Sequence, residues 1–235
     1  MMNTYFQLGQ YVDAELVARK IIEMENIPED KREVALKRIS ESIYKNAEKL
    51  EQEENYVEAG YEYLRVFRDA TGDVQFVDLA LLKAGAAFDK AEQYNKAIEA
   101  YYLLADNFPK SKYAVPALEA AAQDYKILED YVKVAETFED IYKRFPEKKE
   151  AEIALYNSSY YYAEAKDWQN AIRINELYVQ RYPDSPDSKD LYFENAKYYL
   201  KLDNLESANE IYRQFAVKFP NDPRVVEAYY QRGKY

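Results

Sequence analysis

The chain has 235 residues, with 43 acidic and 32 basic side chains and neither cysteine nor histidine. The absence of Cys and His excludes disulfides, cysteine nucleophiles, the usual zinc ligands and the commonest general base. A formal net charge of -11 disfavours nucleic acids and membrane surfaces as partners, because phosphates and anionic lipids repel a negative protein. The composition, 48% hydrophobic and 32% charged, is typical of a folded, soluble protein.

The N-terminal segment carries no recognisable targeting signal. It lacks a basic region and an apolar region, and Asp13 and Glu15 follow soon after. No run of about 18 apolar residues occurs, so we expect no direct membrane insertion. A chain without cysteine suits the cytosol and the periplasm equally, which leaves the compartment open.

A repeat with a period of 37 residues organises most of the chain. Aromatic-proline pairs recur at this spacing: Phe108-Pro109, Phe145-Pro146, Tyr182-Pro183 and Phe219-Pro220. A column of small apolar residues extends the repeat toward the N-terminus: Ala14, Ala59, Ala97, Val134, Ala171 and Ala208. Its spacings are 45, 38, 37, 37 and 37 residues. Regular repeats of this length determine the whole fold.

Within each unit, large and small residues follow one another at steps of three, four and seven, as in amphipathic helices. The first half of the unit holds three columns: Leu81, Leu118, Leu155, Tyr192; Gly85, Ala122, Ser159, Ala196; and Phe88, Tyr125, Tyr162, Tyr199. The second half holds two more: Tyr101, Phe138, Asn175, Tyr212; and Leu104, Ile141, Tyr178, Phe215. Each unit is therefore predicted to be a pair of helices.

These columns resemble the tetratricopeptide repeat. The resemblance is closest over residues 78–109, through Leu81, Ala84, Gly85, Phe88, Ala97, Tyr101, Leu104 and Pro109. It implies an all-α, right-handed α-solenoid of about six antiparallel helix pairs. The period exceeds the usual value of about 34 residues. With this longer period, the chain is similar to a bacterial envelope type of tetratricopeptide protein that includes outer-membrane assembly lipoproteins and Tol-Pal coordinator proteins. The resemblance implies a periplasmic or outer-membrane location, with the cytoplasm as the alternative.

We interpret the chain as one solenoid segment of a longer protein, cut inside a unit at both ends. In chain order its units are expected at residues 1–28, 29–73, 74–110, 111–147, 148–184, 185–221 and 222–235, the first and last being partial. The eight extra residues in the first spacing are expected to lengthen one helix, from about Glu29 to Glu53. Thr71-Gly72-Asp73 replaces the aromatic-proline turn after that unit.

The remaining turn signals lie between units. Ser185 and Asp222 each precede a proline and are predicted to cap the next helix, with the proline at its first position. The acidic run at residues 184–190 lacks the spacing, glycine and final glutamate of a calcium loop. We interpret it as a capped turn rather than a metal site.

No sequence motif indicates catalysis. The chain has no glycine-rich phosphate loop, nucleophile elbow or metal-ligand constellation. Among 43 carboxylates, pairs at catalytic separation arise by chance and carry little information. We therefore predict a non-catalytic protein without cofactor or metal.

The 26 tyrosines are the most unusual feature of the composition, and most of them fall on the core columns. In tetratricopeptide arrays the first helix of each unit lines a concave groove. The resemblance thus implies groove positions at Leu82, Glu119, Tyr156, Phe193 and Tyr230, and one turn on at Ala86, Gln123, Tyr160, Lys197 and Lys234. The predicted partner-binding residues are Tyr156, Asn157, Tyr160, Phe193, Lys197, Tyr230 and Lys234. Alternatively, these rings are packed between units.

The leading functional hypothesis is a protein-interaction scaffold that holds a peptide or helix along this concave face, with Lys197 and Lys234 meeting carboxylates. One alternative is a saccharide-binding module that stacks exposed tyrosines on sugars such as those of peptidoglycan. Another is a regulatory arm of a larger enzyme or complex. The family's clamp for C-terminal carboxylates is not reproduced, which disfavours an adaptor for chaperone tails.

Asn175 interrupts an otherwise aromatic column, and Ser159 is the polar member of the small column in the same unit. A buried amide without a partner costs about 1 to 3 kcal/mol. We therefore predict a hydrogen bond between Asn175 and Ser159, with Ser158 nearby.

Overall fold

The computed structural model describes residues 1–69 and 76–234, which form α-helices and turns without a strand. The helices are α1 (Met2–Gln7), α2 (Tyr11–Ile22), α3 (Glu29–Gln52), α4 (Tyr56–Asp69), α5 (Val77–Lys90), α6 (Tyr94–Asn107), α7 (Ala114–Ile127), α8 (Tyr131–Arg144), α9 (Glu150–Glu164), α10 (Trp168–Arg181), α11 (Pro186–Lys201), α12 (Leu205–Lys218) and α13 (Val225–Lys234). The predicted all-α fold of helix pairs is confirmed. The turn predicted at residues 71–73 lies outside the described residues.

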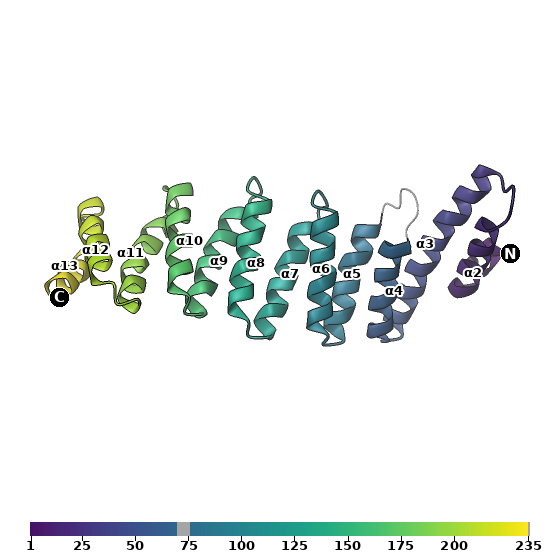
Figure 1. Ribbon diagram of the computed structural model, residues 1–235, viewed down its shortest axis with the longest axis horizontal. Coiled ribbons are helices and arrows are strands. Elements are labelled where there is room, and N and C mark those ends of the chain that lie inside the picture. Colours follow the sequence, from purple (N-terminus) through teal and green to yellow (C-terminus); the bar gives the residue numbers. More distant parts are fainter. Residues whose placement is uncertain (70–75, 235) are drawn as a thin grey trace. The chain divides into compact units, whose positions relative to one another are not determined.

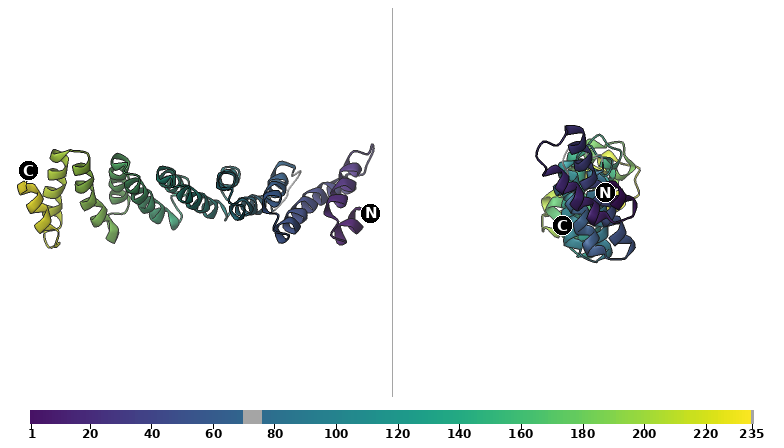
Figure 2. Two further views of the ribbon diagram at one scale, coloured as in Figure 1. Left: turned by 90° about the horizontal axis from the view of Figure 1, so that it is seen from below. Right: turned by 90° about the vertical axis from the view of Figure 1, so that its right-hand side faces the viewer.

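The chain divides into two compact units, Met1–Asp124 and Tyr125–Tyr235. Within each unit, the helices that pack most extensively are neighbours in the chain, such as α3 with α4 and α9 with α10. Figures 1 and 2 show this serial order inside each unit. Such packing is typical of helical repeats, in which each pair is stabilised by the pairs beside it. The predicted residue ranges from 29 to 221 each contain one helix pair.

The long helix predicted near Glu29 is confirmed as α3, which has 24 residues. It begins after Pro28. The negative charges of Glu29 and Asp30 in its first turn interact favourably with the positive end of the helix dipole. Its buried face repeats every four residues, at Ala35, Ile39, Ile43 and Ala47. The extra residues of the first spacing thus extend one amphipathic helix and add no separate element.

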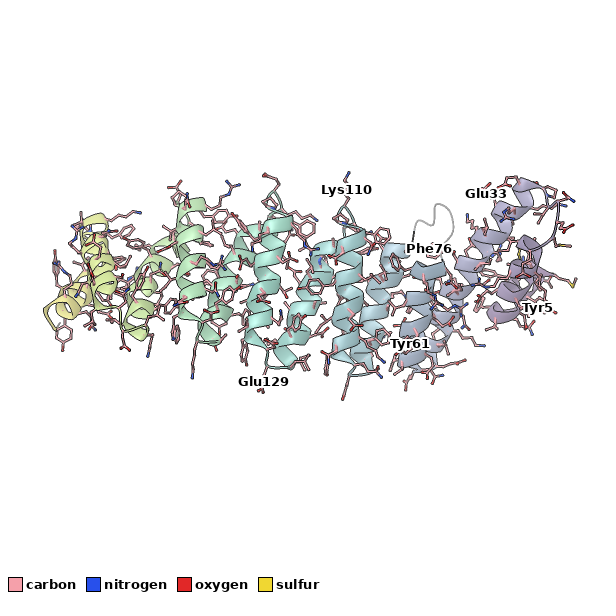
Figure 3. All side chains as sticks on the ribbon, viewed as in Figure 1. Tyr5, Glu33, Tyr61, Phe76, Lys110 and Glu129 are labelled. Carbon is pink, nitrogen blue, oxygen red and sulfur yellow. The ribbon has the colours of Figure 1, made fainter. Side chains whose placement is uncertain are left out.

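The turn inside each helix pair depends on a residue with left-handed backbone. These residues recur at the repeat spacing and have positive φ angles: Gly9, Glu54, Glu92, Glu129, Lys166 and Asp203. The next residue closes the turn, as when the Asp130 amide donates to the Tyr125 carbonyl at 2.9 Å. Figure 3 labels Glu129 at such a turn. This column escapes sequence analysis because only its first member is glycine.

Replacing Glu129 with glycine is expected to stabilise the folded chain by about 0.5 to 1 kcal/mol, since glycine adopts positive φ without strain. The φ angle of Glu129 is 58°. Denaturant unfolding of the variant measures the change. Glu99→Gly, an exposed position inside α6, is the control and should lose about 1 kcal/mol. A loss of stability in Glu129→Gly would contradict the strain argument.

The two predicted proline caps turn out differently. Ser185 does occupy the N-cap of α11 with Pro186 at the first position, but its side chain makes no cap hydrogen bond. Its hydroxyl lies 2.9 Å from the Tyr178 hydroxyl instead. Asp222 accepts the Arg224 amide at 3.0 Å, while α13 begins only at Val225. The prediction is therefore wrong about how Ser185 stabilises its helix, and wrong that Pro223 is the first residue of the next helix.

The predicted pairing of Asn175 with Ser159 is confirmed. The Ser159 hydroxyl donates to Asn175 Oδ1, and both side chains are buried. Ser158 is also buried, but its hydroxyl has no hydrogen-bond partner among the described residues. The predicted hydrogen bond thus joins α9 to α10 through Ser159 and does not involve Ser158.

Candidate functional site

Helix α9 exposes a stripe of large apolar side chains. Ile153, Tyr156 and Tyr160 are 64%, 38% and 51% exposed, and their spacing of three and four places them on one side of the helix. We call these three residues the α9 face. The opposite side of α9 is buried through Leu155, Ser159 and Tyr162. An amphipathic helix normally buries its large apolar residues, so the α9 face is a candidate binding surface.

Neighbouring rings hold the two tyrosines of the α9 face in place. Tyr160 meets Tyr161 edge-on, with ring centroids 5.1 Å apart. Tyr161 in turn stacks on Phe138 of α8, at 5.8 Å and an interplanar angle of 5°. Tyr156 packs edge-on against Tyr178 of α10 at 6.3 Å. Rings that are already fixed lose little freedom on binding, which favours their use as anchors.

Two carboxylates lie near the α9 face. Glu164 is exposed one turn beyond Tyr160 on the same side of the helix. Tyr198 of α11 lies near Tyr156, and burial, the charge of Glu194, Tyr156 and the charge of Glu164 raise the pKa of Tyr198 to about 12. Its phenol therefore stays neutral at physiological pH. A cation is also nearby, because the Lys126 ammonium lies 5.9 Å from the Tyr161 ring centroid.

The structure exposes three of the six predicted partner-binding residues whose side chains it describes. Tyr156 and Tyr160 share one side of α9, and Asn157 beside them is half-buried. Tyr230 is 69% exposed on α13. The structure does not describe the side chain of Lys234. Tyr156 and Tyr160 are thus brought together on a single helix.

Phe193 corrects the predicted stripe. Its side chain is 1% exposed and packs against Tyr212 and Phe215, with ring centroids 5.5 and 4.7 Å away. The Arg224 guanidinium covers it at 5.2 Å from the ring centroid. Phe193 is therefore a core residue, and the prediction that its ring is available to a partner is wrong.

Lys197 also differs from its predicted role. Its ammonium pairs with Glu194 at 2.7 Å and lies 5.4 Å from the Phe193 ring centroid. An intramolecular carboxylate thus occupies the position that a partner's carboxylate was predicted to take. Sequence analysis also omitted Ile153, although it lies one turn before Tyr156 and that spacing was visible in the sequence.

The described residues contain no cluster of acidic side chains arranged to hold a metal ion. Among the described helices, none is long and apolar enough to cross a bilayer. The α9 face offers ring surfaces and nearby carboxylates, which bind through contact and charge rather than through reactive groups.

A sequence profile described as Tetratricopeptide repeat matches residues 79–111 and 153–185. The chain contains tetratricopeptide repeats. The first match covers most of α5 together with α6, and the second covers most of α9 together with α10. The α9 face therefore lies on the first helix of a matched repeat. No curated protein sequence matches the chain.

Several solved structures are similar in fold. BtubC (BKLC) from P. vanneervenii has 13% sequence identity and a TM-score of 0.41, covering 92% of each chain. A putative kinesin light chain with TPR-like repeats from Podosopora anserina has 16% identity and a TM-score of 0.42, covering 84% of this chain and 98% of its own. MamA protein has 15% identity and a TM-score of 0.42, with coverage of 83% and 95%. None of these similarities assigns a partner or an activity to this chain.

Proposed function

We propose that the protein is a non-catalytic scaffold that binds a segment of another protein through the α9 face. The exposed, pre-positioned rings of Tyr156 and Tyr160 carry this proposal. Their place on the first helix of a tetratricopeptide repeat supports it, because such repeats are generally interaction scaffolds. Tyrosine rings of this kind are frequent hot spots in protein interfaces.

The charges beside the face favour a cationic partner segment. Glu164 is exposed beside Tyr160, whereas Lys197 is already paired with Glu194. An arginine or lysine over a tyrosine ring gains a cation–π contact as well as a nearby carboxylate. We infer that the partner places an apolar residue near Ile153 and a basic residue near Glu164.

The test begins with peptides selected from a random display library on the wild-type protein. The double variant Tyr156→Ala, Tyr160→Ala should bind these peptides at least about 10-fold more weakly, as expected when two hot-spot rings are removed. Its melting temperature should change by only a few degrees, since both rings are largely exposed. Tyr61→Ala in α4, where Tyr61 is 48% exposed, is the matched control and should retain binding.

The charge preference has its own readout. Replacing the basic residue of a selected peptide with glutamate should weaken binding to the wild type, and Glu164→Gln should reduce that difference. Peptides whose affinity is unchanged by the double tyrosine variant would overturn the proposed site. Retention of glycans by the wild type, lost in the same variant, would favour the saccharide alternative.

We also propose, on the 37-residue period alone, that the protein works in a bacterial cell envelope. Fractionation of cells that produce the natural protein, followed by immunoblotting, tests this location. Recovery only in the cytoplasmic fraction would contradict it and would leave the binding proposal unchanged.

A further inference from the structure

A pair of acids, one buried and one half-buried, lies where α5, α6 and α7 meet in the unit of residues 1–124. Asp124 of α7 is only 3% exposed, and its carboxyl faces that of Asp89, a half-buried residue at the end of α5. The Tyr101 hydroxyl of α6 donates to Asp89 Oδ2 at 2.5 Å. One buried oxygen of each acid, Asp89 Oδ1 and Asp124 Oδ2, has no donor among the described residues.

Neither acid forms a salt bridge within the part of the chain that the structure describes. Among the described residues, no lysine or arginine influences Asp124, and the groups that face it are Asp89 from α5 and Tyr101 from α6. Gln93, at the start of α6, adds another buried oxygen without a partner. A buried carboxylate that faces a second carboxylate pays a large penalty for ionisation.

The neighbouring repeat provides an internal comparison. Glu51 occupies the repeat position of Asp89 and likewise accepts a tyrosine hydroxyl, from Tyr63 at 2.9 Å. There, however, Lys90 lies 2.7 Å and Lys83 3.6 Å from the carboxylate. Burial opposes ionisation of Glu51, yet these partners lower its pKa. The same position thus holds a neutralised carboxylate in one repeat and an acid pair in the next.

We propose that Asp124 keeps its proton in the folded protein and donates it in a hydrogen bond to the Asp89 carboxylate, and that loss of this proton at alkaline pH loosens α7 from α5 and α6. This proton supplies the missing donor between two acceptor-only groups. Tyr101 does not titrate in this range, because burial first, and then its hydrogen bond to Asp89, raise its pKa. The packing of α7 against α5 and α6 therefore depends on pH through the single proton between Asp124 and Asp89.

The direction of the pH effect follows from linkage. Burial first, and then the charge of Asp89, raise the pKa of Asp124 to about 8. In the unfolded chain an aspartate titrates near about 3.9. Between these values the folded chain holds a proton that the unfolded chain has lost, so stability falls as pH rises. The equilibrium constant for unfolding should increase by up to about tenfold per pH unit from this site, and level off above about pH 8.

Asp124→Asn is the decisive variant, because an amide can donate to Asp89 without titrating. Guanidinium unfolding of the full chain is measured at several pH values between 5 and 9. We expect the variant to be more resistant than the wild type at alkaline pH, with a weaker pH dependence. Asp184→Asn, in an exposed turn, changes the net charge equally and should retain the wild-type pH dependence.

Two further measurements locate the effect and identify the bound species. Hydrogen exchange, corrected for its intrinsic pH dependence, should show that alkaline pH reduces protection of residues 77–127 in the wild type and not in Asp124→Asn. At neutral pH, the infrared band of a protonated carboxyl should disappear in the variant. Equal pH dependence of wild type and variant would overturn the proposal. So would stabilisation of the wild type at alkaline pH by calcium or sodium at constant ionic strength, because a cation would then take the place of the proton.

Discussion

Replacing Gly85 with alanine is expected to destabilise the protein by about 2 to 3 kcal/mol. An added Cβ atom would lie 2.3 Å from Cε1 of the Tyr101 ring and 2.6 Å from two further ring carbons. The ring cannot move away easily, because Tyr101 is 3% exposed and its hydroxyl is bonded to Asp89. Helix propensity alone would favour alanine by about 1 kcal/mol, so the predicted sign is opposite to the local expectation.

Denaturant unfolding of Gly85→Ala and a double-mutant cycle check this prediction. Tyr101→Ala removes the clashing ring, so adding Gly85→Ala in that background should have a much smaller effect. Gly233→Ala in α13 is the control, since no atom lies within 4 Å of the added Cβ. Stability losses that simply add in the double variant would show that the contact with Tyr101 is not the cause.

The repeat columns were predictable because equivalent packing contacts recur in each sequence repeat. Gly85 faces Tyr101, while Ser159 faces Asn175, so a smaller residue in one column accompanies a larger residue in the other. Such volume matching is required in a close-packed helix interface. The matched residues are about 16 positions apart within one unit. Because this spacing is the same in every unit, the repeat pattern in the sequence predicts which residues face each other.

The candidate site was less predictable because it depends on residues outside the columns. Tyr156 and Phe193 occupy the same repeat position, yet the first is 38% exposed and the second 1%. Arg224 makes part of the difference: it lies over the Phe193 ring and is held by Asp190 at 2.8 Å and by Asp222 at 2.9 Å. An ion-pair network that does not recur at the repeat spacing leaves no periodic signal.

The acid pair illustrates the same limit within the core. Asp124 occupies a position where the next repeats have Tyr161 and Tyr198, so no column marks it as unusual. Its importance depends on its contact with Asp89 and on the absence of the lysines that neutralise Glu51. Periodicity predicts which positions are buried, whereas charge compensation depends on three-dimensional neighbours.

Replacing Asn175 with alanine is expected to destabilise the protein by about 3 to 4 kcal/mol. The Asn175 amide donates to Asn195 Oδ1 at 2.8 Å and to the Leu191 carbonyl at 3.2 Å, and its oxygen accepts from Ser159. Asn175 and Asn195 are fully buried and Ser159 is 1% exposed. Truncation therefore leaves several buried polar groups without partners and also creates a cavity.

A set of variants separates these two causes. Asn175→Leu fills the volume but still leaves Ser159 and Asn195 unsatisfied, so most of the loss should remain. Adding Ser159→Ala and Asn195→Leu removes the unpaired groups, and the triple variant should recover much of the lost stability, because replacing all members of a buried polar set by apolar residues is often nearly neutral. Asn221→Ala, in an exposed turn, is the control and should change little. If Asn175→Leu alone restores stability, the lost volume, and not the unsatisfied hydrogen bonds, accounts for the effect of Asn175→Ala.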